Sequence, residues 1–336
     1  MKLYLLFIIF LIYIKICDGR KKFIPAKINN YLNYTNDVVF NKVFGELNNK
    51  VKVFCIFLTT PKNKNSRIIH QKNTWVKRCN AYIYASGKQD RTLPAIKAYK
   101  DDHYKFSYAK MATVFKYVYS NYVNQYDWFL KIDCDTYVVM ENLKMLLLNK
   151  NPNEHYYSGF QFNLNNWKDT NFRYHHGGSG YVMSKKTFSS LVTDGLGNKK
   201  YCRIRDEGYE DLEIGLCLYN LKIKINDGRD KYGKILYLPI ALSDALTPYK
   251  NDKKDYYLSE RSIFKYPNGI KAMSNYPIAF HKVEGNTMYM LEYLIYHMNV
   301  AGLRNPMLIP ENENVDKEAE SIMEKISNYS STYYKN

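Results

Sequence analysis

Short apolar runs alternate with amphipathic stretches along most of the chain. Residues 51–58 form a nearly continuous apolar run, which is typical of a strand buried on both faces of a sheet. Residues 81–85 and 128–132 are two further strand candidates, and residues 107–123 carry apolar side chains at helical spacing on one face. This alternation predicts an α/β fold with an open, Rossmann-like sheet. In such sheets, ligands bind at the carboxyl ends of the strands.

The N-terminal residues form a hydrophobic segment. Residues 3–14 are almost entirely apolar, and a basic cluster follows at residues 20–22. The run is shorter than the roughly 20 residues of an average membrane-spanning helix, so a cleaved signal peptide is the alternative to an anchor. Because residues 17–19 make a poor cleavage site, we expect an uncleaved signal anchor at residues 1–17. Either reading places the remaining chain in the secretory lumen.

The composition beyond this segment predicts three regions. Residues 18–50 are polar and Asn-rich and are expected to form a stem, whereas residues 51–310 are expected to be one catalytic domain. Residues 311–336 are charged and then rich in Ser and Tyr, which predicts a C-terminal tail. Asn33 lies in an Asn-x-Thr sequon, which is compatible with lumenal glycosylation.

The chain is strongly basic, with 49 Lys and Arg against 32 Asp and Glu, for a formal charge of +17. Such an excess is found in proteins that bind nucleic acid or anionic lipid. Here the lysines are scattered, and no nucleic-acid-binding module is visible. We therefore expect no nucleic-acid partner, whereas a nucleotide phosphate remains a plausible ligand.

Four of the six cysteines form two local pairs in the sequence. Cys55 and Cys79 flank one strand–helix unit, and Cys202 and Cys217 flank another. In an oxidising lumen these pairs would form disulfides, although four buried free thiols are the alternative. Of the other two, Cys17 lies at the end of the N-terminal apolar run and Cys134 lies between two aspartates.

Those two aspartates end the strand predicted at residues 128–132. Asp133 and Asp135 are spaced Asp-x-Asp. Carboxylates at the carboxyl end of a strand can hold a hard divalent cation that is shared with a diphosphate. An Asp-x-Asp triplet is also common in loops that bind nothing, so the position at the strand end is what favours a metal site.

Three further motifs each have a functional and a structural interpretation. The glycine-rich segment 177–180 either lets the backbone approach a ligand or is a plain turn. Glu210 and Asp211 begin a predicted helix, where they either complement its dipole or supply a general base. His281 ends an apolar run, and a lone histidine is more often a satisfied core residue than a ligand.

Taken together and in this order, these segments resemble the core 1 β1,3-galactosyltransferases (T-synthases). These enzymes belong to the wider β1,3-glycosyltransferase family that also contains the Fringe enzymes. The resemblance extends from about residue 51 to residue 298 and includes Phe54-Cys55, Thr74-Trp75, Arg78-Cys79-Asn80, the run 127–138, the run 177–185, Glu210-Asp211-Leu212, Phe280-His281-Lys282-Val283 and Leu291-Glu292-Tyr293-Leu294.

The resemblance implies a GT-A fold, in which a Rossmann-like mixed sheet is flanked by helices. It implies a type II membrane protein of the Golgi that uses Mn²⁺ to transfer galactose from UDP-galactose. The acceptor would be O-linked GalNAc on Ser or Thr of glycoproteins, with inversion to a β1,3 linkage. A homodimer is compatible with this interpretation.

The resemblance also implies residue roles. Asp135 and His281 would bind the metal, with Asp133 supporting the metal–nucleotide site. Asp211 would be the catalytic base, with Glu210 as its rival. Both cysteine pairs named above would be disulfides. The implied donor-site residues are Leu58, Thr59, Lys110, Asp133, Cys134, Gly177 and Gly178.

The chain departs from the family pattern at three places. Cys134 stands where the family usually has a third aspartate, and residues 257–280 lack its Trp-rich acceptor segment and paired cysteines. An Arg expected just before the predicted helix 107–123 is absent, and Tyr104 and Lys105 stand nearby. These departures keep two alternatives open, a related β1,3-glycosyltransferase with a different acceptor and a non-catalytic chaperone on the same fold.

Overall fold

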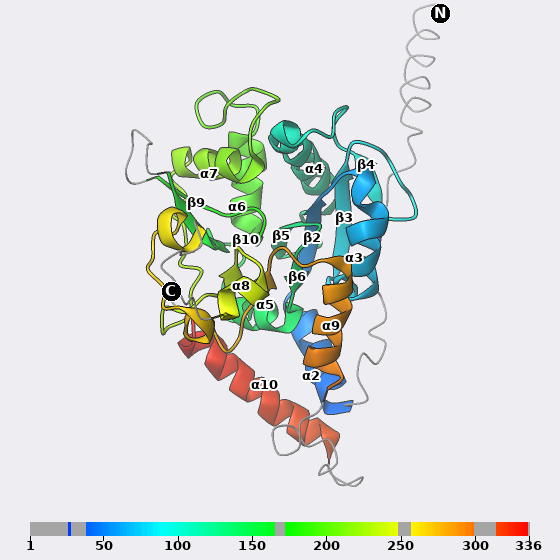
Figure 1. Ribbon diagram of the computed structural model, residues 1–336, viewed down its shortest axis with the longest axis vertical. Coiled ribbons are helices and arrows are strands. Elements are labelled where there is room, and N and C mark those ends of the chain that lie inside the picture. Colours follow the sequence, from blue (N-terminus) through cyan, green and yellow to red (C-terminus); the bar gives the residue numbers. More distant parts are fainter. Residues whose placement is uncertain (1–25, 28–37, 165–171, 248–256, 299–313, 335–336) are drawn as a thin grey trace, which may run out of the picture.

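A mixed β-sheet with helices on both faces forms the centre of the molecule (Figure 1). The computed structural model describes residues 26–27, 38–164, 172–247, 257–298 and 314–334. Within these residues the main sheet contains β1 (Ala26–Lys27), β2 (Val53–Leu58), β3 (Ala81–Ser86), β4 (Ala95–Lys97), β5 (Trp128–Asp133), β7 (Tyr157–Gly159) and β10 (Tyr181–Ser184).

The strand order is β1-β3-β2-β5-β10-β7, with β4 beside β3. The pairs formed among β2, β3, β4 and β5 are parallel, whereas β1 and β10 run antiparallel to their neighbours. Smaller sheets are formed by β6 (Tyr137–Val138), β11 (Tyr237–Leu238) and β12 (Ala279–Phe280), and by β8 (Gln161–Asn163) and β9 (Arg173–His175).

The helices complete the two layers around this sheet. They are α2 (Val38–Lys50), α3 (Ile69–Asn73), α4 (Ser107–Tyr122), α5 (Met140–Leu147), α6 (Lys185–Ser190), α7 (Glu210–Asn220), α8 (Leu242–Leu246), α9 (Gly285–Tyr296) and α10 (Val315–Thr332). Met111 of α4 and Ile214 of α7 belong to one hydrophobic core, and Leu143 of α5 and Met288 of α9 belong to the other.

Strand β2 shows why the sheet is covered on both faces. All six of its residues are apolar and buried. Because successive side chains of a strand point to opposite faces, alternate residues enter different cores. Val53, Cys55 and Phe57 join the core that contains α5, whereas Phe54, Ile56 and Leu58 join the core that contains α4.

The strands predicted at residues 51–58, 81–85 and 128–132 are confirmed as β2, β3 and β5, and the predicted helix 107–123 is confirmed as α4. The parallel register pairs Leu58 with Asp133. The carboxyl ends of β2 and β5 therefore lie side by side, where the sequence placed its candidate ligands.

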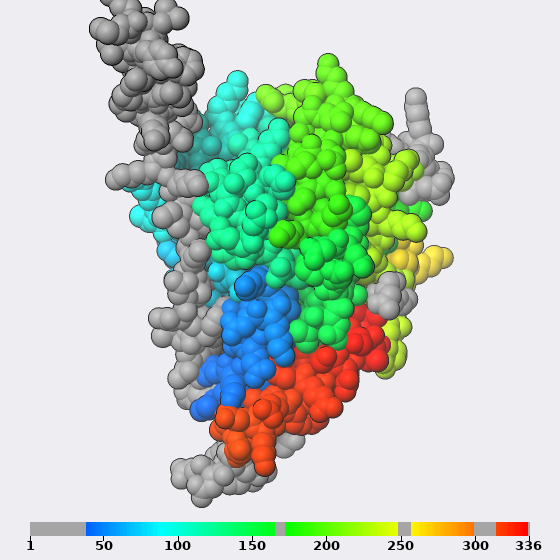
Figure 2. Space-filling model, turned by 180° about the vertical axis from the view of Figure 1, so that it is seen from behind, coloured from blue at the N-terminus to red at the C-terminus, as the bar shows by residue number. Residues whose placement is uncertain are grey.

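Two helices lie in the segments predicted as stem and tail. Residues 38–50, assigned to the stem, form α2, and most of the predicted tail forms α10. The two helices lie against each other across the base of the molecule (Figure 2) and share the cluster Val39, Val43, Leu47, Ala319 and Met323. The buried apolar residues of α2 are Val39, Val43, Phe44 and Leu47, and they are interspersed with Asn, Lys and Glu, so composition masked the helical pattern.

Two predictions lie outside the described residues. These are the anchor at residues 1–17 and the sequon at Asn33. Among the residues that the structure describes, no helix has both the length and the apolar character needed to cross a membrane.

Candidate active site

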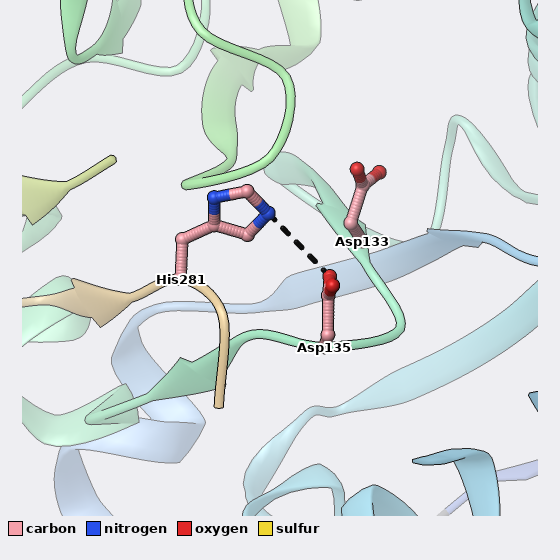
Figure 3. Close-up of side chains that lie close together, drawn as sticks. All are labelled: Asp133, Asp135 and His281. Carbon is pink, nitrogen blue, oxygen red and sulfur yellow. Dashed lines mark ion pairs between the residues drawn. The ribbon is translucent and has the colours of Figure 1, made fainter. Parts of the chain in front are cut away.

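Asp133, Asp135 and His281 come together at the carboxyl edge of the main sheet (Figure 3). Asp133 is the last residue of β5, Asp135 lies in the turn before β6, and His281 directly follows β12. Because β12 pairs with β6, the distant histidine is brought beside the Asp-x-Asp turn. One ligand atom from each residue lies within 4.8 Å of the other two, and the imidazole Nε2 is 3.5 Å from Asp135 Oδ1.

The imidazole of His281 is oriented by the backbone. Its Nδ1 lies 2.9 Å from the carbonyl oxygen of Pro239, which can only accept a hydrogen bond. The hydrogen is therefore assigned to Nδ1, and Nε2 points toward Asp135 (Figure 3). Burial lowers the pKa of His281, but the hydrogen bond and charge of Asp135 outweigh it and raise the pKa above its usual value. Two carboxylates and one oriented imidazole form a donor set that fits a divalent metal.

Lys131, to which no role was assigned from the sequence, connects Asp133 to the start of α7. Its side chain is buried, with Nζ 2.8 Å from Asp133 Oδ1 and 2.5 Å from Glu210 Oε2. The ammonium also donates to the carbonyl oxygen of Gly177 at 3.0 Å. Tyr181 donates its hydroxyl hydrogen to the second carboxylate oxygen of Glu210. Both carboxylate oxygens of Glu210 thus have a partner inside the protein.

The two rival bases differ in accessibility. Glu210 is only 3% exposed, and burial together with the nearby charge of Asp211 raises its pKa to about 7 against the opposing effect of Lys131. Asp211 is half-buried, and its Oδ2 accepts a hydrogen bond of 2.9 Å from the backbone N–H of Gly177. The N–H of Leu212 also donates a hydrogen bond of 2.8 Å to Oδ1, so two backbone contacts orient Asp211. Its side chain is nevertheless more exposed than that of Glu210.

The glycine-rich segment lies directly against these side chains. A β-carbon added at Gly178 would meet the imidazole of His281 at 2.5 Å, and one added at Gly177 would meet Glu210 Oε2 at 2.8 Å. The carbonyl of Gly178 accepts a hydrogen bond of 2.6 Å from the Thr136 hydroxyl. The segment forms a turn whose glycines let the backbone pack on the side chains of the site, and its approach to a ligand stays a prediction.

The remaining predicted donor-site residues lie beside the same strand ends. Thr59 follows β2 and is buried, and its carbonyl accepts a hydrogen bond of 2.7 Å from Lys110 Nζ. Lys110 also forms an ion pair with Asp102 at 2.5 Å. The buried thiol of Cys134 lies 3.1 Å from Asn63 Nδ2. Burial raises the pKa of Cys134 to about 11, so this residue is a neutral thiol near pH 7.

Two comparisons with known proteins bear on this geometry. The sequence profile described as Fringe-like matches residues 48–229, which is more than half of the chain. The chain is also 30% identical, over 276 residues, to the glycoprotein-N-acetylgalactosamine 3-beta-galactosyltransferase 1 of Xenopus laevis, and these residues cover 82% of this chain and 75% of that protein.

This chain belongs to the Fringe-like glycosyltransferase family. The profile match contains Asp133, Asp135 and Asp211, whereas His281 lies beyond its end. The parallel strands and the helices on both faces of the sheet agree with the GT-A fold expected of such a glycosyltransferase.

Both expected disulfides are present in this Fringe-like glycosyltransferase. Cys55 is bonded to Cys79, and Cys202 is bonded to Cys217. The first bond joins β2 to the segment before β3, and the second holds α7, the helix that carries Asp211. Cys134 has a free thiol.

Two positively charged side chains of this glycosyltransferase site, those of Lys131 and Arg67, were not identified from the sequence. Lys131 was seen only as part of a strand, although a charged residue two positions before Asp133 shares its side of the strand. Arg67 Nη1 lies 3.1 Å from Asp135 Oδ2. Its charge and that of His281 lower the pKa of Asp135 although burial opposes them. No local signal in the sequence distinguishes Arg67 from other surface arginines.

Proposed function

We propose that the chain transfers galactose from UDP-galactose to O-linked GalNAc of glycoproteins. The product would carry a β1,3 linkage formed with inversion, and the reaction would use Mn²⁺. The observation that carries the proposal is the position of Asp211, which the Gly177 backbone orients next to the Asp133–Asp135–His281 cluster. The substrate assignment is supported by the name of the Xenopus laevis relative, a glycoprotein-N-acetylgalactosamine 3-beta-galactosyltransferase.

The metal would be held by Asp135 and His281, with Asp133 supporting it. When bound, the cation would supply a Lewis acid that neutralises the charge of the diphosphate. The protein prepares this site in two ways. The Pro239 carbonyl keeps the imidazole Nε2 directed at Asp135, and Lys131 holds one oxygen of Asp133. The donor nucleotide would lie along Leu58, Thr59, Lys110 and Cys134, beside the same strand ends.

Asp211 would act as the base. As the acceptor hydroxyl oxygen bonds to the anomeric carbon, its proton passes to a carboxylate oxygen of Asp211. The bond from that carbon to the UDP oxygen breaks, and UDP leaves with the electron pair. Displacement from the opposite side inverts the anomeric centre. Glu210 is the weaker candidate because it is only 3% exposed, with its carboxylate held by the buried side chains of Lys131 and Tyr181.

A second candidate differs only in the acceptor. Residues 257–280 lack the Trp-rich segment expected of a core 1 enzyme. The ring of Tyr257, within this segment, instead stacks on Phe162 with centroids 5.5 Å apart. A β1,3-glycosyltransferase acting on another glycan would keep the metal cluster and Asp211 and change this segment. A non-catalytic chaperone would have no use for the cluster, and its retention argues against that alternative.

The proposal includes the cellular setting predicted from the sequence. A signal anchor at residues 1–17 would hold the enzyme in Golgi membranes with its catalytic domain in the lumen. Protease treatment of sealed membrane vesicles tests this orientation. A C-terminal tag that is protected until detergent is added supports it, and a tag digested in intact vesicles contradicts it.

The reaction is tested by incubating the full-length protein with UDP-galactose, Mn²⁺ and a panel of acceptors. The panel contains a GalNAc-α-peptide, the same peptide without sugar, and glycans ending in GlcNAc, fucose or galactose. Galactose attached through a β1,3 linkage to the GalNAc-α-peptide supports the proposal. Transfer only to another glycan favours the second candidate, and hydrolysis or binding without any transfer contradicts both.

A further inference from the structure

Two exposed tyrosines stand together beside the candidate base. The rings of Tyr104 and Tyr209 have centroids 5.5 Å apart and are tilted by 39°. They are 59% and 55% exposed although each contacts the other. Single exposed aromatic residues are common on protein surfaces, but a contacting pair that leaves both rings open to solvent is a larger apolar patch.

Backbone contacts fix the position of the pair. Tyr104 begins a 3-10 turn, Tyr104–Phe106, immediately before α4, and Tyr209 immediately precedes α7. The N–H of Gly208 donates to the carbonyl of Lys105 at 2.6 Å, and the N–H of Tyr108 donates to the carbonyl of Gly208 at 3.1 Å. Gly208, directly before Tyr209, is therefore held by two backbone hydrogen bonds to the segment that follows Tyr104.

Further contacts tie the same segments to the catalytic end of α7. Ser107 Oγ accepts a hydrogen bond of 3.1 Å from the N–H of Glu210 and donates one of 3.1 Å to the carbonyl of Gly208. Lys105 forms an ion pair of 2.6 Å with Glu207. The position of the aromatic pair is thus coupled to the first turn of α7, which carries Asp211.

The pair lies close to the proposed base along the chain. Tyr104 contacts Tyr209, and Tyr209 stands two residues before Asp211 at the start of α7. Desolvation and the negative charges of Asp133 and Asp211 raise the pKa of Tyr104 well above its usual range, which agrees with this position.

We propose that Tyr104 and Tyr209 form a binding subsite for the pyranose ring of the acceptor. The proposal rests on the proposed glycosyl transfer, because that reaction places an acceptor hydroxyl at Asp211. A pyranose presents one face of C–H groups that packs on an aromatic ring, while its hydroxyls remain available to Asp211. Tyrosine suits this role because it offers a rigid, amphipathic surface with few rotatable bonds. The donor sugar is the poorer fit, since its diphosphate is bound at the metal side.

The test uses full-length protein with Tyr104→Ala, Tyr209→Ala, the double Ala variant and the two Phe variants. Tyr232→Ala is the matched control, because Tyr232 is 67% exposed and packs on Tyr333 next to α10. Initial rates with UDP-galactose, Mn²⁺ and a GalNAc-α-peptide give the KM values of acceptor and donor. Saturation-transfer NMR of metal-free protein with methyl α-glycosides of GalNAc, galactose and glucose measures sugar binding without turnover.

We expect each Ala variant to raise the acceptor KM about five- to tenfold, while the donor KM changes less than about twofold. The Phe variants keep the ring and are expected to stay close to the wild type. The NMR signal of the glycoside should be lost in the double Ala variant and retained in Tyr232→Ala. A circular-dichroism melt of each variant separates these effects from misfolding.

The results distinguish this proposal from the proposed function. An unchanged acceptor KM and glycoside signal in the double Ala variant overturn the subsite, even if galactose transfer is observed. If the wild type transfers nothing to GalNAc, a tyrosine-dependent glycoside signal still supports the subsite and shows that the acceptor was wrong. A wild type that binds none of the glycosides overturns the subsite. The subsite is also overturned if the double Ala variant has a raised KM for the GalNAc-α-peptide but keeps the NMR signal of the glycosides. The tyrosine pair would then recognise the polypeptide and not the sugar.

Discussion

Lys131 and Glu210 form a buried ion pair, with Nζ 2.5 Å from Oε2. The same ammonium contacts Asp133 at 2.8 Å and the Gly177 carbonyl at 3.0 Å. One side chain therefore links a metal carboxylate to the peptide segment whose N–H orients Asp211. This arrangement explains why Glu210, although adjacent to the proposed base in sequence, is a structural partner in this site.

Replacing Lys131 by Met is expected to lower the free energy of unfolding by about 3–5 kcal/mol. The reason is that Glu210 and Asp133 lose their buried counterion while they remain desolvated. Denaturant melts measure the change. Lys116→Met is the control, because Lys116 is exposed on α4 and its replacement should change stability by less than about 0.5 kcal/mol. Equal stability of the two variants would show that the ion pair contributes little.

Asp211→Asn and Glu210→Gln are expected to impair different properties, the first catalysis and the second stability. Removal of the base is expected to lower kcat about 10²- to 10⁴-fold, with UDP binding and melting temperature close to the wild type. Glu210→Gln should mainly reduce stability, because it leaves Lys131 without one of its two carboxylates. Steady-state kinetics with parallel thermal melts make the comparison. A severe kcat defect confined to Glu210→Gln would reverse the assignment of the base.

Because Lys144 is buried, we expect the free energy of unfolding to increase with pH above pH 7. Its ammonium is buried and donates to Asn48 Oδ1, the Val51 carbonyl and Asn80 Oδ1, each at 2.7 Å. Burial lowers its pKa from 10.5 to about 7. Between these values the unfolded chain binds more protons than the folded protein, so the free energy of unfolding increases with pH, by up to about 1.4 kcal/mol per unit.

Chemical denaturation at about pH 7, 8 and 9 measures this slope. Lys144→Met removes the titrating group and should flatten the curve, after correction for any uniform loss of stability from the unpaired acceptors. A slope that is the same in both proteins would show that Lys144 does not titrate in this window.

The packing of α2 on α10 predicts that α2 is part of the folded domain. Leu47 is 2% exposed within the α2–α10 cluster, so Leu47→Ala is expected to cost about 2–4 kcal/mol of stability. Asn49→Ala, on the exposed side of the same helix, is the control. Thermal melts of both variants make the test. An unchanged melting temperature for Leu47→Ala would mean that α2 contributes little to the stability of the domain.

The strands that build the site were predictable because their apolar runs end at polar or turn-forming residues, and the run of β5 ends at Asp133. Asp133 and Asp135 follow from that reasoning alone. His281 does not, since its approach depends on the pairing of β12 with β6, which no local pattern encodes. Only the resemblance to a known family assigned it to the metal.

Other features required the tertiary structure. Lys131 is one charge inside an apolar strand, and its partners come from α7 and the glycine-rich segment. The aromatic pair joins residues about 100 positions apart through backbone hydrogen bonds that side-chain patterns do not reveal. The helix α2 was not predicted because its burial depends on α10, which is distant in the sequence and covers the apolar side chains of α2.

The most direct test of the account is galactose transfer to a GalNAc-α-peptide by the full-length protein, with Mn²⁺ and with EDTA. The account predicts transfer that requires Mn²⁺, disappears in His281→Ala together with Mn²⁺ binding, and is lost in Asp211→Asn while Mn²⁺ binding persists. Transfer that is undiminished in EDTA, or that survives Asp211→Asn, would contradict the proposed roles of the metal cluster and the base.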